Sequence, residues 1–458
     1  MTAYGEFLAR KAQLANAGGF AATGLPSHLF GFQAALVEWA TRMGRAAVFA
    51  DCGLGKTLIE LEYATQVYRR TGRPVLLLTP LAVGFQIVAE AARFGYDAAT
   101  SRTGQVAATI TVTNYEQLTK FSPDDFGGVV CDESSILKAF DGVTRQAITE
   151  FMRRTPYRLL GTATAAPNDW TELGTSSEAL GGLGHTDMLT RFFVSDQRTV
   201  TSRSSFAAGG RAVGFRLKGH AVDPFWRWVA SWSRALRRPS DLGFPDDGFH
   251  LPPLIEREHL VQASLSAPGT LFDVPAHGLA DEREETRRTL TERCEAAAAA
   301  LEHAHHAVAW CHLNDESTLL THLIPGAVEV AGADSPAQKE EALAAFTRGE
   351  IRVLVTKPSI GAWGLNWQHA SQMTYFPSHS YEAYYQAVRR MWRFGQTQPV
   401  HVDVITTTGG RAVLDNLRRK ASAADEMFSR LVAHMNDALT VRGHSYDTPM
   451  EAPAWLAS

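Results

Sequence analysis

The chain has 458 residues, a length that allows about three domains of ordinary size. Hydrophobic residues make up 45% of it and charged residues 20%, and this balance excludes a disordered or collagen-like chain. Because 48 acidic residues oppose 44 basic ones, giving a formal net charge of -4, the chain as a whole is not a basic nucleic-acid-binding protein, and any basic surface must be local.

Short apolar runs alternate with helix-like stretches from about residue 30 to about residue 180. Apolar runs of this length are typical of strands that are buried on both faces of a parallel sheet. The expected strands are 47–50, 75–79, 110–113, 129–131 and 157–161. The alternation predicts an α/β domain over residues 1–184.

Residues 185–254 differ in charge from the segment before them. Between positions 190 and 240, ten basic residues are opposed only by Asp196 and Asp223, which gives a net charge of +8. Apolar residues at three- and four-residue spacing predict an amphipathic helix over 225–238, with Arg227, Arg234 and Arg238 on its polar face. We therefore expect a basic helical insertion that contacts nucleic-acid phosphates; the alternative is an arginine-rich solvated surface packed on the first domain.

A second α/β series begins near residue 282, after an expected linker at 255–281. Its expected strands are 308–311, 328–330, 353–356, 373–376 and 400–405, and a helical tail follows them. This series predicts a second α/β domain over 282–458. The predicted fold class is therefore α/β, with two domains of parallel sheets and flanking helices and a basic helical insertion between them.

The sequence Ala-Asp-Cys-Gly-Leu-Gly-Lys-Thr at 50–57 follows an expected strand and precedes an expected helix. That context is the one a phosphate-binding P-loop requires. Gly53 and Gly55 would let backbone N–H groups approach phosphate at the positive end of a helix. Lys56 would reach the β- and γ-phosphates, and the hydroxyl of Thr57 would bind Mg²⁺.

Asp132 and Glu133 follow the apolar strand expected at 129–131. They would therefore lie at the carboxyl edge of the sheet, near the P-loop, and we expect their strand to lie beside the P-loop strand. Asp132 would hold Mg²⁺, and Glu133 would orient and deprotonate the attacking water.

Further short motifs lie in a fixed order around these two. They are Phe32-Gln33, Thr79-Pro80, Thr113-Asn114-Tyr115-Glu116, Gly161-Thr162-Ala163-Thr164, Gly364-Leu365-Asn366 and the run from Gln386 to Gln396, QAVRRMWRFGQ. Together the motifs resemble those of superfamily II DEAD/DEAH-box-like helicases of the Swi/Snf-type branch, and most those of compact members that bacteriophages encode. The resemblance covers about residues 29 to 406 and implies two tandem RecA-like domains.

The resemblance implies ATP and Mg²⁺ as ligands. Gln33 would read the adenine edge, and the ATP site would also include Gly53, Gly55, Lys56, Thr57, Gly364, Asn366 and Gln386. Arg390 and Arg393, expected on one face of a helix, would be arginine fingers that stabilise charge on the γ-phosphate. Because they lie in the second domain, hydrolysis would require the two domains to close.

The remaining motifs are assigned by the same resemblance to nucleic-acid binding and to coupling. The expected backbone contacts are Thr79, Pro80, Asn114 and Tyr115, and the expected coupling residues are Gly161, Thr162 and Thr164. Two departures from the family pattern weaken the expected coupling to nucleic acid. The acidic box reads DESS, with Ser135 in the place of a usual histidine, and Thr-Ala-Thr replaces a more common Thr-Pro.

The predicted function is an ATP hydrolase that couples hydrolysis to movement on DNA, with duplex favoured and single-stranded or forked DNA left open. The alternatives are a strand-separating helicase on forked DNA or RNA, and a nucleotide-gated binding module with slow hydrolysis. Phage or host replication and recombination proteins remain open as partners, and the motor could work as a monomer. Four cysteines without a CxxC pair, and no apolar run of about 18 residues, predict a cytoplasmic protein without a membrane span, in the bacterial host if a phage encodes it.

Overall fold

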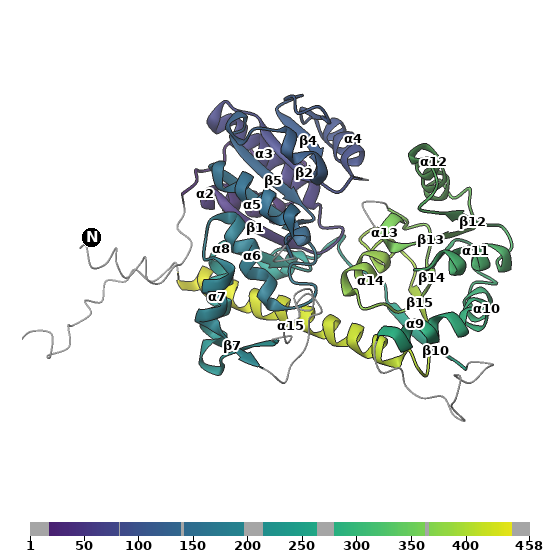
Figure 1. Ribbon diagram of the computed structural model, residues 1–458. Helices are drawn as coiled ribbons and strands as arrows, with labels where there is room; N and C mark the ends of the chain where they lie inside the picture. Colours follow the sequence, from purple (N-terminus) through teal and green to yellow (C-terminus); the bar gives the residue numbers. More distant parts are fainter. Residues whose placement is uncertain are drawn as a thin grey trace, which may run out of the picture.

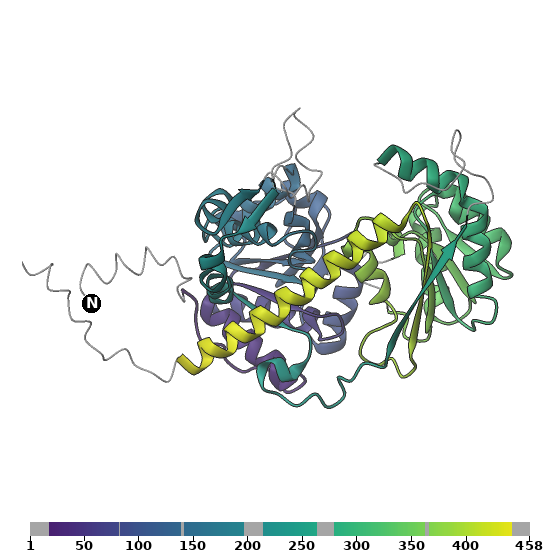
Figure 2. The ribbon, with the colours of Figure 1, turned by 90° about the horizontal axis from the view of Figure 1, so that it is seen from below.

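Two α/β units lie next to each other, and a long C-terminal helix runs along both of them (Figures 1 and 2). The structure is a computed structural model that describes residues 18–81, 83–138, 142–196, 214–262, 279–361 and 366–441. The predicted α/β class with two parallel sheets is confirmed. Within the described residues, no helix combines the length and apolarity needed to cross a membrane.

The first sheet has seven parallel strands in the order β3-β4-β2-β5-β6-β1-β9. Its strands are β1 (Arg45–Ala50), β2 (Val75–Thr79), β3 (Ala98–Thr100), β4 (Ile110–Asn114), β5 (Gly128–Asp132), β6 (Tyr157–Thr162) and β9 (Ser233–Leu236). The expectation that β5 lies directly beside the P-loop strand β1 is wrong, because β6 lies between them. The two nucleotide motifs still share the carboxyl edge, one strand apart.

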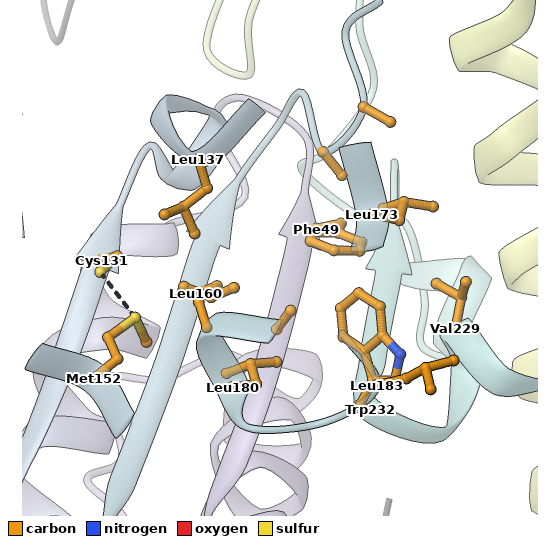
Figure 3. Close-up of a cluster of buried hydrophobic side chains, with 14 of the residues drawn as sticks. Phe49, Cys131, Leu137, Met152, Leu160, Leu173, Leu180, Leu183, Val229 and Trp232 are labelled. Carbon is orange, nitrogen blue, oxygen red and sulfur yellow. Dashed lines mark hydrogen bonds between the residues drawn. The ribbon is translucent and has the colours of Figure 1, made fainter. Parts of the chain in front are cut away.

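Helices cover both faces of this sheet, which explains why its central strands are apolar throughout. One face packs on α2 (Gly31–Met43), α3 (Lys56–Thr71) and α4 (Gly84–Phe94). The other face packs on α5 (Val143–Arg154), α6 (Leu173–Leu180), α7 (His185–Phe192) and α8 (Val222–Trp232). Figure 3 shows the second core, where Phe49 of β1 and Leu160 of β6 meet Trp232 at the end of α8.

The helix expected over 225–238 ends earlier than predicted. It stops at Trp232, and residues Ser233–Leu236 form β9, which pairs in parallel with β1 at the edge of the first sheet. Together with the antiparallel pair β7 (Phe193–Asp196) and β8 (Gly214–Leu217), α8 packs against the core of the first sheet. The first sheet therefore takes its last strand from the segment that was expected to be an insertion beyond residue 184.

The second sheet has six parallel strands in the order β10-β15-β14-β11-β13-β12. Its strands are β10 (Leu254–Val261), β11 (Ala307–Trp310), β12 (Ala327–Val330), β13 (Val353–Thr356), β14 (Gln372–Tyr375) and β15 (Val400–Thr407). Its helices are α9 (Leu279–Arg288), α10 (Leu290–Ala300), α11 (Asn314–Leu323), α12 (Pro336–Thr347), α13 (Pro358–Gly361) and α14 (Tyr381–Val388). The expected linker at 255–281 thus contains β10, an edge strand of this sheet.

Helix α15 (Arg411–Val441) joins the two units. Near its start, Leu414 and Leu417 belong to the core of the second sheet. Near its other end, Met427, Leu431 and Met435 are buried in the core of the first sheet, beside α8 and β9. Figure 2 shows this helix crossing from one unit to the other.

Candidate functional site

The P-loop forms the predicted turn between β1 and α3. Gly53 and Gly55 have φ angles of 88° and 72°, in the left-handed region that glycine adopts without strain. Helix α3 begins at Lys56, so its N-terminal N–H groups face the loop. The Nζ atom of Lys56 donates to the backbone oxygen of Ala50 at 3.0 Å, across the loop. The loop therefore has the backbone shape and the positive charge that a polyphosphate needs.

Gln33 is buried beside the P-loop and supports it. Its Nε2 donates to the backbone oxygen of Leu54, and its Oε1 accepts from the backbone N–H of Phe30, both at 3.0 Å. A Cβ atom at Gly55 would lie 2.3 Å from Gln33 Nε2, so only glycine fits there. Gln33 thus links the start of α2 to the P-loop.

Asp132 and Glu133 lie at the carboxyl end of β5. Thr79 donates to Asp132 Oδ2 at 3.0 Å, and Thr162 donates to Glu133 Oε2 at 3.3 Å. Glu133 has a φ of 52°, the one positive φ among the non-glycine residues that the structure describes. Burial, and next the charge of Glu133, raise the pKa of Asp132 to about 7. A buried carboxyl with raised pKa beside a P-loop is ready to exchange its proton for a metal ion.

The pKa of Lys56 is affected by the same two carboxyl groups. Burial acts to lower its pKa, but nearby negative charges, including those of Glu133 and Asp132, outweigh that effect and raise it. Lys56 is therefore held as a cation close to the acidic pair. This is the charge arrangement that a magnesium–phosphate complex would complete.

The predicted arginines come from the second domain, but not from a helix. Helix α14 ends at Val388, so Arg390 and Arg393 lie in the turns that follow it, and the expected helical face is wrong. Arg390 donates from Nε to the backbone oxygen of Gln386 and from Nη2 to its side-chain Oε1 at 2.8 Å. Arg393 donates to Oδ1 of Asn366. Gly364 lies outside the described residues.

Burial disfavours the charged forms of Arg390 and Arg393. Burial lowers the pKa of Arg390, although Cys52 and Glu133, both in the first domain, act to raise it. Burial and the charge of Arg390 lower the pKa of Arg393 to about 10. An anion bound between them would relieve both effects. Two partly desolvated guanidinium groups facing a P-loop therefore indicate a phosphate site.

The two domains touch directly at the nucleotide motifs. Asp51 of the P-loop accepts from Arg389 Nη2 and from the hydroxyl of Tyr385. At Gly53 of the same loop, a Cβ atom would lie 2.9 Å from the ring of Phe394, so the loop after α14 packs on the P-loop. The sequence motifs did not single out Asp51 or Arg389, because their link joins residues 338 positions apart.

A second contact joins the acidic box to α14. Glu382 accepts from Ser135 Oγ and from Lys138 Nζ. Ser135 of the acidic box therefore contacts the second domain directly. Glu382 is buried and Lys138 is half-exposed, so this pair lies at the rim of the interface.

The expected nucleic-acid contacts differ in their exposure. Tyr115 is buried, and its hydroxyl donates to the backbone oxygen of Asp132, so it supports the acidic box rather than the surface. Arg227 and Arg238 are exposed, the former on α8. Arg234 is 9% exposed on β9, where its guanidinium lies 4.3 Å from the ring of Trp39. Its side chain packs within the first domain and is not part of the exposed surface.

The other predicted backbone contacts, Thr79, Pro80 and Asn114, lie together at the carboxyl ends of β2 and β4. Thr79 is 1% exposed, and its hydroxyl is bound to Asp132. Pro80 and Asn114 are half-buried. Two exposed apolar side chains lie next to them, Leu81 at 58% and Phe85 at 58% exposure. This edge of the first sheet thus offers a surface beside the acidic box.

The expected coupling residues lie at the end of β6 and just after it, and they are buried. Thr162 is bound to Glu133 through its side chain and accepts from the backbone N–H of Thr164 at 3.0 Å. A Cβ atom at Gly161 would lie 1.9 Å from Oε1 of Glu60 in α3, which explains the glycine. Beyond this segment, a cavity of about 820 Å³ separates the two domains, closed on one side by α15. The segment therefore connects the acidic box to a gap that a domain movement can change.

The described residues fit ATP with Mg²⁺. The P-loop cradle accepts no Cβ at Gly53 or Gly55, Lys56 lies inside the loop, and Asp132 lies at the facing strand end. Thr57 follows in the first turn of α3 and, with Asp132, offers the oxygen ligands that Mg²⁺ prefers.

Comparisons with known proteins give little at the level of sequence. No protein-family model matches the chain, and no curated protein matches it. Among solved structures, it is similar to the SWI2/SNF2 ATPase core of Sulfolobus solfataricus in complex with double-stranded DNA, at 15% identity and a TM-score of 0.42. That similarity covers 90% of this chain and 96% of the other.

Proposed function

We propose that the protein is an ATP-dependent DNA translocase whose hydrolysis site is completed by its second domain. One observation supports this most. Glu133 and Asp132 of the first domain lie close enough to Arg390 of the second for their charges to act on its pKa, and the same two carboxyls act on the pKa of Lys56. An arrangement of this kind binds a nucleotide between two domains and makes hydrolysis depend on how they are placed.

Each side chain then has a specific part in hydrolysis. Lys56 and the P-loop N–H groups hold the β- and γ-phosphates, and Glu133 orients the attacking water and takes its proton. Arg390 and Arg393 stabilise the charge that develops on the transferred phosphoryl group. Mg²⁺, held by Thr57 and Asp132, would neutralise charge on the phosphate oxygens. Gln33 positions the P-loop and lies where the adenine would follow.

The polymer is the second part of the proposal. Thr162 ties Glu133 to the segment that borders the interdomain cavity, so a change at the γ-phosphate can alter domain placement. Arg227 and Arg238 are exposed cations that can bind backbone phosphates, and the surface at Pro80 and Asn114 offers a second contact. The sequence resemblance favours duplex DNA and a compact bacteriophage-type motor acting with replication or recombination proteins.

Steady-state ATP hydrolysis tests the proposal. It is measured without polymer and with single-stranded DNA, duplex DNA, forked DNA and RNA, and Lys56→Ala serves as the blank. Strong stimulation by plain duplex, absent in the blank, is expected. Preference for forks or RNA would move the assignment to a strand-separating helicase. Hydrolysis that no polymer stimulates would contradict the translocase and favour a nucleotide-gated binding module.

A further inference from the structure

Helix α14 presents three polar side chains to the first domain in a regular pattern. Glu382, Tyr385 and Arg389 are spaced three and four residues apart, so they lie along one side of the helix and its C-cap. All three bind residues of the two nucleotide motifs. The neighbouring side carries Gln386 and leads into the turn with Arg390. One helix therefore both contacts the first domain and supports an arginine of the site.

The two contacts have opposite polarity. At the P-loop, the second domain supplies the cation, Arg389, and the first supplies the anion, Asp51. At the acidic box, the second domain supplies the anion, Glu382, and the first supplies the cation, Lys138. Such a pattern resists sliding of the helix, because a shift along its axis brings like charges together.

The contact at the P-loop is well buried. Arg389 and Asp51 have side chains that are 8% and 4% exposed. The guanidinium also lies 4.3 Å from the ring of Trp392 and 5.2 Å from that of Tyr385. An arginine held by a carboxylate and two aromatic rings has little freedom, so the chain just before Arg390 is fixed.

We propose that Glu382, Tyr385 and Arg389 form a latch, which sets the position of Arg390 and Arg393 over the P-loop. The latch consists of two contacts, one of Glu382 with the acidic box and one of Tyr385 and Arg389 with the P-loop. The latch residues are positioning residues: they act through the arginines. Ser135 belongs to the latch, and so gives the acidic box a direct link to the second domain. This inference rests on the proposed function for its kinetic test, whereas the contact itself can be tested without hydrolysis.

The contact is tested first by zero-length cross-linking. A carbodiimide joins a carboxylate and an ammonium group that touch, so the wild-type chain should yield a peptide linked between Lys138 and Glu382. Arg389→Gln, which removes the contact with Asp51 at the P-loop, should lower the yield of that peptide severalfold. Absence of the peptide from the wild-type chain would overturn the latch. A chain that gives the peptide but no ATP hydrolysis would overturn the proposed function and still support the latch.

The positioning role is tested by charge exchange. Glu382→Lys and Lys138→Glu should each lower kcat of polymer-stimulated hydrolysis about tenfold, with KM for ATP changed less than about threefold, because the P-loop is untouched. The double variant should recover kcat to within about threefold of wild type. Lys120→Glu, at an exposed lysine of the first domain, is the matched control and should leave both constants unchanged.

Two results would overturn the positioning role. One is a wild-type kcat in both single variants. The other is a double variant no faster than the slower single variant although its thermal unfolding matches that of wild type. Ser135→Ala removes one hydroxyl without changing charge. This milder variant keeps the positioning role testable if the charge variants misfold. It should lower kcat by a smaller factor, about threefold, with KM unchanged.

Discussion

Glu60 is a carboxyl group buried without a partner, and its replacement by glutamine should change how stability depends on pH. It is 2% exposed, and neither of its carboxylate oxygens has a hydrogen-bond partner. Burial, and next the charge of Asp132, raise its pKa well above the ordinary value. Glutamine has the same shape and no charge, so Glu60→Gln removes the ionisation while keeping the packing.

The sign of the effect follows from proton binding. Above the unfolded pKa of about 4.3, the unfolded chain has lost this proton and the folded chain keeps it. Folding therefore takes up a proton, and its contribution to the free energy of unfolding falls as pH rises until the folded pKa is passed. The slope is at most about 1.4 kcal/mol per pH unit. Glu60→Gln does not have this pH-dependent loss. Its free energy of unfolding should therefore rise relative to that of wild type by up to about 1.4 kcal/mol per pH unit.

Urea unfolding of both proteins at a series of pH values from about 5 upward measures the difference, in which titrating groups that do not interact with Glu60 cancel. A constant offset from the unpaired amide is compatible with the reasoning, because it does not vary with pH. A difference between Glu60→Gln and wild type that stays constant across pH would refute the raised pKa.

Three further perturbations address other parts of the molecule. Arg393→Ala should lower ATP turnover by about 10³ if this arginine stabilises the transferred phosphoryl group, and steady-state hydrolysis at saturating ATP measures it. Arg227→Glu with Arg238→Glu should reduce the slope of log affinity for duplex DNA against log salt by about 2, whereas an unchanged slope would exclude phosphate contacts there. Leu431→Ala should lower the free energy of unfolding by about 2–5 kcal/mol, since its side chain is fully buried in the core between the first sheet and α8, and urea unfolding would show it.

The order of the main elements could be predicted from sequence because the central strands are apolar on both faces. Residues Val75–Thr79 and Val353–Thr356 form strands with the expected bounds. Edge strands lack that signal. Strand β10 has mainly half-buried and exposed side chains, and β9 is four residues long and contains Arg234. From the sequence alone, neither segment can be distinguished from a loop or from the end of a helix, because the signal depends on the strand that pairs with it.

The same limit applies to the candidate site. Lys56, Asp132 and Arg390 were found because each lies in a local motif with a characteristic spacing. Asp51 and Arg389 each lie within such a motif, but their pairing spans most of the chain. Local spacing could not indicate that contact, nor that Tyr115 points inward to the backbone of Asp132. Contacts between distant segments depend on the packing of the domains.

Helix α15 has a consequence for the order in which the protein matures on the ribosome. Met427, Leu431 and Met435 complete the hydrophobic core of the first sheet, although they follow every strand of the second. Domains commonly fold as they emerge, N-terminal first. The surface of α8 and β9 that these side chains cover therefore stays uncovered until α15 has been synthesised and has left the ribosome. Nascent chains halted before α15 should therefore bind chaperones through that face, whereas chains extended past it should not.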